Sequence, residues 1–576
     1  MIQADQVRRQ LDRIVGSSGF TNSERLRRFL CYVVHAVLEG RASEVKEYTL
    51  GVEVFDRGAD YDPRLEPIVR VEARRLRSKL AKYYETDGRL DPVLISLPTG
   101  SYTPLWEIRT PAKAAAPPRP SAAPTIAVLP FADSANDYLA NGLAEELIRA
   151  LTRASGLRVV AWPSAVETVP RDARRIGEQV GASYVLDGRM WTAGERLRVT
   201  AQLVETATGF YMWSEIYDRE SPDAFPLFEN LARAIVAALE TRLGPVPPAP
   251  GPLPRPRNPE AYNAYLKGRF HWNKRSTEGL NRAIVHFEQA LAADPHYAPA
   301  HAGLADAYSI LGQSGQVRPH EYMPKAKAAA ARALEIDPGS AEAHASLGVI
   351  AAAYDYDWET SAEYLRKAIL SNPNYATAHH WYAYDYLTPV GRLEEAAEEI
   401  ELALQLDPLS PAIGVAAGTI FAWSRQYERA IEMFHNTLEL DASAYRIHLN
   451  LGRTYIEQGR LDEGLAVLEN IPGPGRGYPV TLATKGHALA ARGRTAEAMA
   501  LVRELEHRAL TDYVSPFLFA RLYCGFPDPS RAMEWLERGY EDRDSHLIHA
   551  RVAPLFDPLR SYPRFQRLLE KIRLAG

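Results

Sequence analysis

The most informative stretch of the chain combines apolar and basic positions at the spacing of a helix. Between residues 66 and 85, apolar side chains recur every three or four residues, at Val69, Ala73, Leu76, Leu80 and Tyr83. This spacing places them on one face of a helix. Basic residues occupy most of the other side, so the segment is predicted to be a helix with one buried face and one cationic face.

Shorter patterns on both sides extend this helix into a small domain. Apolar periodicity predicts a first helix at 24–40 and a second, short one at 45–55. After the basic helix, residues 93–97 alternate, a turn follows at 98–100, and the chain returns through Tyr102. This pattern predicts a hairpin. A helix followed by a hairpin is the order of a recognition helix and a wing.

The cationic face of the third helix predicts contact with DNA. Six basic residues and one acidic residue lie between positions 70 and 82. A duplex major groove accepts a helix that is guanidinium-rich on one face. The alternative is an ordinary amphipathic helix with a solvated basic face. The residues predicted to contact DNA are Arg70, Arg74, Arg75, Arg77, Ser78, Lys79 and Lys82.

The order V-x-V-x-x-R-R-L-R-x-K-L, followed by strands that close on a tyrosine, resembles the winged helix-turn-helix of OmpR- and CadC-like transcription regulators. The resemblance covers residues 1–108 and implies a DNA-binding domain. The wing of that family usually reads G-x-G-Y after an arginine, whereas here Thr99-Gly100-Ser101-Tyr102 follows Pro98. A wing arginine is therefore not expected. Too few residues precede the first predicted helix for a receiver domain.

Residues 125–244 alternate between strands and helices, which predicts a small α/β domain. Proline-rich stretches at 109–124 and 245–257 flank it and are predicted to be linkers. The phrases TIAVLPF, GASYVLDGRM and RLRVTAQLVETATGFYMWSEIYD are similar to the TolB-amino-terminal-like domain. That resemblance implies a fold but no catalytic residues. Trp191, Trp213 and Tyr211 are expected to pack between the sheet and its helices.

Residues 258–576 repeat with a period near 34, which is the length of a tetratricopeptide (TPR) repeat. Second helices carry a small-large-small pattern such as Ala283/Phe287/Ala290, and several end in Asp-Pro or Asn-Pro. The pattern predicts about eight repeats and a capping helix. The TPR resemblance implies a groove lined by first helices that binds a protein or peptide. It places there Tyr262, Tyr265, Arg269, Trp272, Trp381 and Tyr384, although packing against the adjacent repeat is an equal alternative for each tyrosine.

Composition narrows the class of protein. With 46% apolar and 24% charged residues and a net charge of −5, the chain has the composition of a soluble globular protein, and its basic helix is a local feature. Two distant cysteines do not predict a disulfide or metal framework. The longest apolar run falls short of the roughly 18 residues of a membrane span. Because no phosphate loop, nucleophile elbow or metal motif occurs, we expect no enzyme, metal or cofactor.

These observations predict a multidomain, mainly α protein with a winged helix-turn-helix, a small α/β TolB-like domain and a TPR α-solenoid. The expected function is that of a cytoplasmic bacterial transcription regulator. It would bind double-stranded DNA, and its repeats would bind a protein, a peptide or another copy of the chain. The alternative is a TPR scaffold related to the TolB–TPR proteins that accompany nucleotide cyclases. In that case the winged helix serves as a protein-interaction module.

Overall fold

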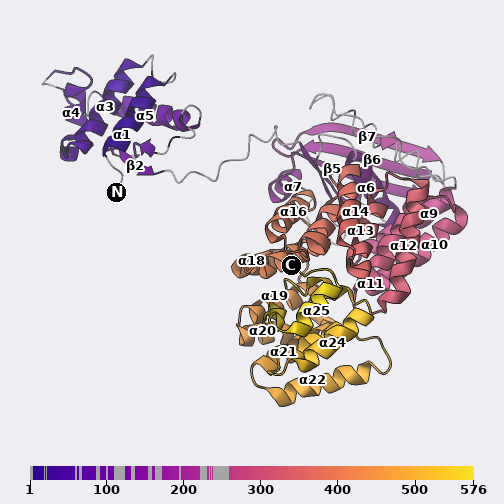
Figure 1. The fold of residues 1–576 in the computed structure, drawn as a ribbon. Helices are drawn as coiled ribbons and strands as arrows, with labels where there is room; N and C mark the ends of the chain where they lie inside the picture. Colours follow the sequence, from indigo (N-terminus) through magenta and orange to yellow (C-terminus); the bar gives the residue numbers. More distant parts are fainter. Residues whose placement is uncertain are drawn as a thin grey trace. The chain divides into compact units, whose positions relative to one another are not determined.

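The chain divides into two compact units, Met1–Ala122 and Ala123–Gly576, which are described separately (Figure 1). The computed structural model describes residues 4–17, 20, 23–58, 61–63, 66, 68–85, 88, 91, 93–98, 101–108, 124–131, 137–152, 158–161, 172–193, 196–220, 230–231, 234, 237 and 258–575. The two predicted linkers, and the helix predicted at 225–243, lie wholly or largely outside these residues.

The first unit contains helices and a two-stranded sheet. Its elements are α1 (Ala4–Gly16), α3 (Glu24–Leu38), the short 3-10 helix η1 (Ala42–Glu44), α4 (Glu47–Glu53), α5 (Ile68–Glu85), β1 (Val93–Ser96) and β2 (Leu105–Ile108). β1 and β2 pair antiparallel, with Val93 opposite Ile108. The returning strand begins at Leu105, after Tyr102. Sequence analysis missed α1, although Val7, Leu11 and Ile14 have helical spacing and are buried.

The core of the first unit gathers the apolar stripes of its helices. The stripe predicted for α5 is confirmed, because Val69, Ala73 and Leu76 are fully buried. It packs with Phe29, Leu30 and Val33 of α3 and with Ile95 of β1 in one cluster. The opposite side of α5 therefore faces away from this core.

The second unit begins with a five-stranded mixed sheet. The strands are β3 (Thr125–Val128), β4 (Arg158–Ala161), β5 (Tyr184–Ala193), β6 (Arg196–Glu205) and β7 (Tyr211–Glu220), in the order β4-β3-β5-β6-β7. β3 runs parallel to β4 and β5, whereas β5, β6 and β7 are antiparallel. The helices α6 (Asp137–Thr152) and α7 (Ala173–Val180) contribute to separate apolar clusters of this sheet. The expected burial is wrong for Trp191 and Tyr211, whose side chains are exposed, whereas Trp213 is partly buried against the core cluster.

The remainder of the second unit consists of successive helix pairs. The pairs are α9 (Pro259–Asn273) with α10 (Thr277–Ala293), α11 (Ala298–Gln313) with α12 (Pro319–Ile336), α13 (Ala341–Ile350) with α14 (Trp358–Ser371), α15 (Ala376–Trp381) with α16 (Leu393–Leu406), α17 (Pro411–Trp423) with α18 (Tyr427–Leu440), α19 (Tyr445–Glu457) with α20 (Leu461–Glu469), α21 (Pro479–Ala491) with α22 (Thr495–Arg508), and α23 (Pro516–Tyr523) with α24 (Ser530–Glu541). The π-helical turns η2 (Ala351–Asp355) and η3 (Tyr382–Leu387) continue α13 and α15, and the 3-10 turn η4 (Gly473–Gly477) precedes α21.

The small-large-small pattern explains how the paired helices approach each other. Phe287 of α10 lies where a Cβ on Gly268 or Gly303 would come within 2.5 or 2.6 Å of its ring. Phe434 of α18 has the same relation to Gly418 of α17, at 2.5 Å. The glycines therefore leave room for one large side chain of the second helix. This arrangement confirms the helix pairing predicted from the repeat pattern.

The α/β region and the first repeats pack against each other. Leu266 of α9 lies against Gly142 of α6. Arg269 Nε donates to Glu145 Oε2 at 3.0 Å, and Asn374 Nδ2 donates to the backbone oxygen of Thr152 at 3.0 Å. The predicted linker at 245–257 thus separates regions that form one compact unit.

The segment after α24 folds back across earlier repeats. It comprises η5 (Ser545–His549), η6 (Pro554–Leu559) and α25 (Pro563–Lys571). Trp358 Nε1 donates to the backbone oxygen of Ile572 at 2.9 Å, and Arg425 pairs with Asp557 at 2.6 Å. Phe556 and Phe565 are fully buried in a cluster that includes Met323 and Ile350. The segment is therefore more than a cap on the last repeat.

Candidate functional site

The outward face of α5 carries exposed cations around one exposed apolar residue. Arg70, Arg74 and Arg75 are all exposed, and Val71 between them is 45% exposed. Arg70 Nε lies 2.9 Å from Glu47 Oε1, and Arg75 Nη1 lies 2.8 Å from Glu72 Oε1. These carboxylates orient two guanidinium groups that remain largely in solvent. Among the described residues, no carboxylate pairs with Arg74.

Two of the predicted DNA contacts have structural partners inside the first unit instead. Arg77 Nε donates to the backbone oxygen of Leu97 at 2.9 Å, and Nη2 donates to those of Pro98 and Ser101 at 2.9 and 3.0 Å. Lys79 Nζ donates to the Ser23 hydroxyl and lies over the Phe20 ring. Both lie at the seam between the buried and exposed faces, as their helical positions indicate, so neither belongs to the outward set of cations. Arg77 fixes the segment that links β1 to β2.

The last two predicted DNA contacts, Ser78 and Lys82, belong to α5, but their side chains lie outside the described part of the structure. Of the predicted set, the structure therefore brings Arg70, Arg74 and Arg75 together on the outer surface. Val71 lies on the same surface, although it was not among the predicted site residues.

The aromatic residues predicted for the first repeat are buried. Tyr262, Tyr265 and Trp272 all belong to the cluster that joins the sheet to the first repeats. Tyr265 packs edge-on against Tyr297, with 5.3 Å between ring centroids. Their predicted exposure in a groove is wrong, because α6 and the second repeat cover α9. Arg269 is also mostly covered, since it pairs with Glu145 and lies 4.1 Å above the Trp272 ring.

The two aromatic residues predicted for the fourth repeat are not open to a groove either. Trp381 is buried with Ile400 and Ile420. Tyr384 is half-buried and stacks on Trp423, at 5.9 Å between centroids, and on His549 of the returning segment, at 4.7 Å. Burial raises the pKa of Tyr384 to about 12. The predicted exposure of these residues is wrong, because neighbouring repeats bury Trp381, while Trp423 and His549 cover part of Tyr384.

The interior of the repeats contains charged groups that sequence analysis did not single out. Asp306 on α11 is fully buried and accepts a hydrogen bond from Ser346, and burial raises its pKa to about 6. Burial likewise raises the pKa of Asp385 in η3 to about 7. Arg521 on α23 is only 4% exposed. Hydrophobic periodicity gave no signal for these positions, because most residues of the first helices are buried.

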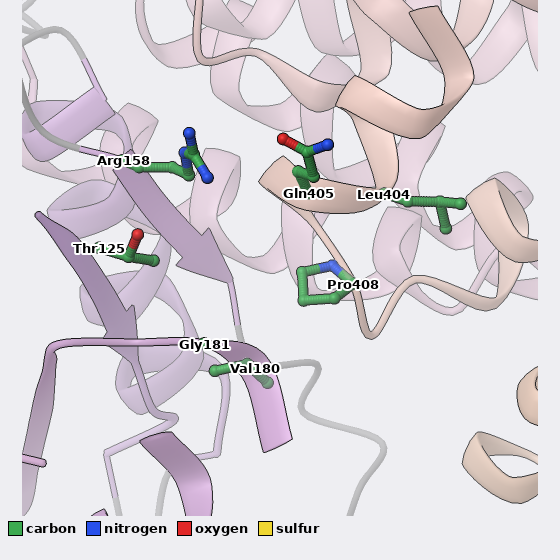
Figure 2. Close-up of a pocket in the computed structure, with 7 residues that line it drawn as sticks. All are labelled: Thr125, Arg158, Val180, Gly181, Leu404, Gln405 and Pro408. Carbon is green, nitrogen blue, oxygen red and sulfur yellow. The ribbon is translucent and has the colours of Figure 1, made fainter. Parts of the chain in front are cut away.

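A cavity of about 300 Å³ lies between the sheet and the fourth repeat (Figure 2). Figure 2 shows Arg158 of β4 and Gln405 of α16 on opposite sides of it. Arg158 is the charged member of a lining that is otherwise neutral. The lining residues are Thr125, Arg158, Val180, Gly181, Leu404, Gln405 and Pro408. The cavity lies at the amino ends of β3 and β4, whereas ligands of open α/β sheets usually bind at the carboxyl ends.

No helix within the described residues combines the length and apolar character that crossing a membrane requires.

Two segments match known protein families. Residues 121–234 match the second domain of HilA/YgeH-like transcriptional regulators, and residues 424–485 match a tetratricopeptide repeat. The chain thus contains a region homologous to a transcriptional regulator domain, together with TPR repeats in its mainly α C-terminal part. The regulator match overlaps the segment predicted to be TolB-like, and that finer assignment stays a prediction.

Similar proteins come from two functional classes. The putative adenylate cyclase 3 of Rhizobium meliloti (strain 1021) is 33% identical over 234 residues, which are 39% of each chain. The transcriptional regulator HilA of Salmonella typhimurium (strain LT2) is 27% identical over 168 residues, which are 29% of each chain. The matches therefore span two fifths or less of these relatives. A solved structure of Pseudomonas aeruginosa PilF is 22% identical, with a TM-score of 0.27, and covers 37% of this chain and 93% of that one.

Proposed function

We propose that the chain is a DNA-binding transcriptional regulator whose first unit is a winged helix that inserts α5 into the major groove. The observation that carries the proposal is the two-sided character of α5. Its apolar stripe is buried, while Arg70, Arg74 and Arg75 are exposed on the outward side. The homology of residues 121–234 to a regulator domain supports the same class of function.

The exposed arginines suit contact with a phosphate backbone. The Arg70 and Arg75 side chains are 57% and 66% exposed, although their partners Glu47 and Glu72 are mostly covered. Because a guanidinium group has five N–H donors, each arginine can keep its carboxylate and still donate to a phosphate. Each phosphate that is neutralised releases condensed counterions, so binding should weaken steeply as salt rises.

Val71 gives the same surface an apolar contact in the midst of its cations. In the major groove, an apolar side chain discriminates bases by touching the methyl group of thymine. Arginines beside it form bidentate hydrogen bonds to guanine. We therefore assign Arg74 and Val71 to base contacts and assign Arg70 and Arg75 mainly to phosphates. Arg77 positions the wing and makes no DNA contact in this proposal.

The repeats supply the second part of the proposed function. TPR repeats bind proteins or peptides in many settings, so we assign to residues 258–576 the binding of a protein partner or of a second copy of the chain. The buried aromatic residues described above are not part of that surface. The regulator is proposed to act in the cytoplasm, and no catalytic step or cofactor is assigned to it.

The decisive experiment compares two double variants in gel-shift titrations across a salt series. Arg70→Ala with Arg75→Ala should flatten the slope of log affinity against log salt by roughly two, at about 0.9 per phosphate lost. Arg282→Ala with Arg332→Ala is the matched control. It also removes two exposed, ion-paired arginines, but from the repeats. The control should keep the slope of the wild type.

A second candidate function is favoured by the match to a putative adenylate cyclase. In that case the chain is a scaffold of the kind that accompanies cyclases, and the first unit binds protein. The same titrations separate the two candidates. Wild-type protein that shifts no genomic fragment at low salt would falsify the DNA-binding assignment and leave the scaffold in its place.

A further inference from the structure

A cluster of charged and aromatic side chains lies on the first helices of the later repeats. We call it the interior cluster and define it by Arg446, Arg453 and Glu457 of α19, His487 of α21, Arg521 of α23, Tyr384, Trp423 and His549. The rings of Tyr384, Trp423 and His549 pack together, with 4.7 to 5.9 Å between centroids. Arg446 is exposed, whereas Arg521 is 4% exposed. The cluster therefore extends from solvent into the protein.

Two arginines of the cluster lack a carboxylate partner. Within the described residues, Arg453 and Arg521 form no ion pair, and the Nε of each is buried without a hydrogen-bond partner. Arg453 Nη1 donates to Asn450 Oδ1 at 3.1 Å, and the Arg521 guanidinium lies over the Phe517 ring. By contrast, Arg269 in the first repeat pairs directly with Glu145. Buried guanidinium groups normally have such a partner.

Within the described residues, the acid of the cluster forms no ion pair with either arginine. Glu457 Oε1 is itself buried without a hydrogen-bond partner. Burial raises the pKa of Glu457, even though Arg453 and Arg521 act to lower it. Of the two other acids nearby, Asp557 pairs with Arg425, and burial raises the pKa of Asp385. Both interior histidines favour the neutral form, because burial lowers the pKa of His487 to about 4 and that of His549 well below its usual value.

The two arginines also repel each other. Burial, followed by repulsion from Arg453, lowers the pKa of Arg521 to about 9, although Glu457 acts to raise it. A cavity of about 10 Å³ beside Arg453 has room for about one water molecule. A water there can accept from an N–H group, but it carries no compensating charge. An anion can accept this hydrogen bond and also carry the compensating negative charge.

We propose that Arg453 and Arg521 bind the oxyanion of a small ligand, either a carboxylate or a phosphate, that enters past Arg446. Trp423, which lines the cavity beside Arg453, then forms the apolar wall against which the body of the ligand packs. The site would make the repeats a receptor for a small anionic molecule, in addition to any protein partner. Its location in the second unit makes it independent of the DNA-binding assignment.

Isothermal titration calorimetry on the full chain tests the proposal with inorganic phosphate and with acetate, at an ionic strength held constant with chloride. Saturable binding of at least one of the two anions is expected, and the one that binds identifies the chemistry. Arg521→Met and Arg453→Met should each weaken that binding at least tenfold. Arg282→Met with Arg332→Met, which removes exposed charges elsewhere in the repeats, should leave it unchanged.

Glu457→Gln provides a second variant that does not depend on tolerance of an arginine change. It removes the nearest negative charge while keeping the shape of the side chain, and it should tighten anion binding severalfold. Unchanged or weaker binding in this variant would count against the site. Heats that never saturate, or that persist in the methionine variants, would overturn the proposal. Binding of an acidic peptide but of neither small anion would overturn it in favour of a peptide ligand.

Discussion

The arginines of α5 and those of the interior cluster use the same side chain in opposite environments. Arg75 is 66% exposed and is oriented by a carboxylate, whereas Arg521 is almost completely buried and lacks one. The first kind suits a large, solvated polyanion, and the second suits a small anion that replaces water. The difference shows that the number of cations on a helix says less about its ligand than their burial and their existing partners do.

The largest expected effect tests the buried side of this comparison. Tyr265→Ala should lower the free energy of unfolding by about 3–5 kcal/mol, because it leaves a cavity between α9, Phe287 and Tyr297. Chemical denaturation of the full chain measures the change. Tyr562→Ala, at an exposed tyrosine of the same region of repeats, is the control and should change stability by less than about 0.5 kcal/mol. Equal effects in both variants would contradict the core assignment.

A second expected effect separates arginines that support the fold from arginines that contact DNA. Arg77→Ala should destabilise residues 1–122 by about 1–3 kcal/mol, since backbone oxygens of Leu97, Pro98 and Ser101 lose a charged donor. Arg77→Lys should restore stability only in part, because an ammonium group cannot reproduce the planar fork. Thermal melting measures both variants. If Arg77→Ala abolished DNA binding but left stability unchanged, Arg77 would contact DNA and would not support the fold.

A third expected effect depends on pH and concerns a buried carboxyl. The pKa of Asp385 rises from 3.8 to about 7 on burial, so its contribution to stability is complete below about pH 4 and is lost as pH rises through 7. Asp385→Asn removes this loss. Between pH 5 and pH 8, the free energy of unfolding of the variant should rise relative to that of the wild type by on the order of 2 kcal/mol. Denaturation at both values measures the gain, and Asp462→Asn, at an exposed site, is the control.

The smallest expected effect tests the exposed side of the comparison. Arg74→Ala should change the free energy of unfolding of residues 1–122 by less than about 0.5 kcal/mol, since the side chain points away from the core. Its affinity for a preferred DNA site should nevertheless fall by about 1–3 kcal/mol if Arg74 grips a guanine. A large loss of stability would show that Arg74 supports the fold, as Arg77 does.

Features that depend on a regular spacing of residues were predicted correctly from the sequence, whereas features that depend on irregular or distant contacts were not. The stripe of α5 and the helix pairs were predicted correctly, because one repeating spacing determines which side is buried. Spacing also indicated that Arg77 and Lys79 lie at the seam, but it cannot tell a solvated cation there from one that bonds to another element of the same unit. The aromatic residues of α9 and of the fourth repeat were misplaced for another reason. Their burial depends on contacts that no periodicity reports: α6, the neighbouring repeats and, for Tyr384, His549 of the returning segment.

The returning segment also affects the order in which the protein can form. Tandem repeats ordinarily fold in any order, because each one touches only its neighbours. Here Trp358 bonds to Ile572 across 214 positions, and Phe556 packs with side chains that reach back to Met323. The ribosome makes residues 545–572 after the repeats that they cover. During synthesis, the apolar surface around Ile350 and Trp423 therefore remains open to chaperones, and the repeats gain long-range cooperativity only when this segment docks.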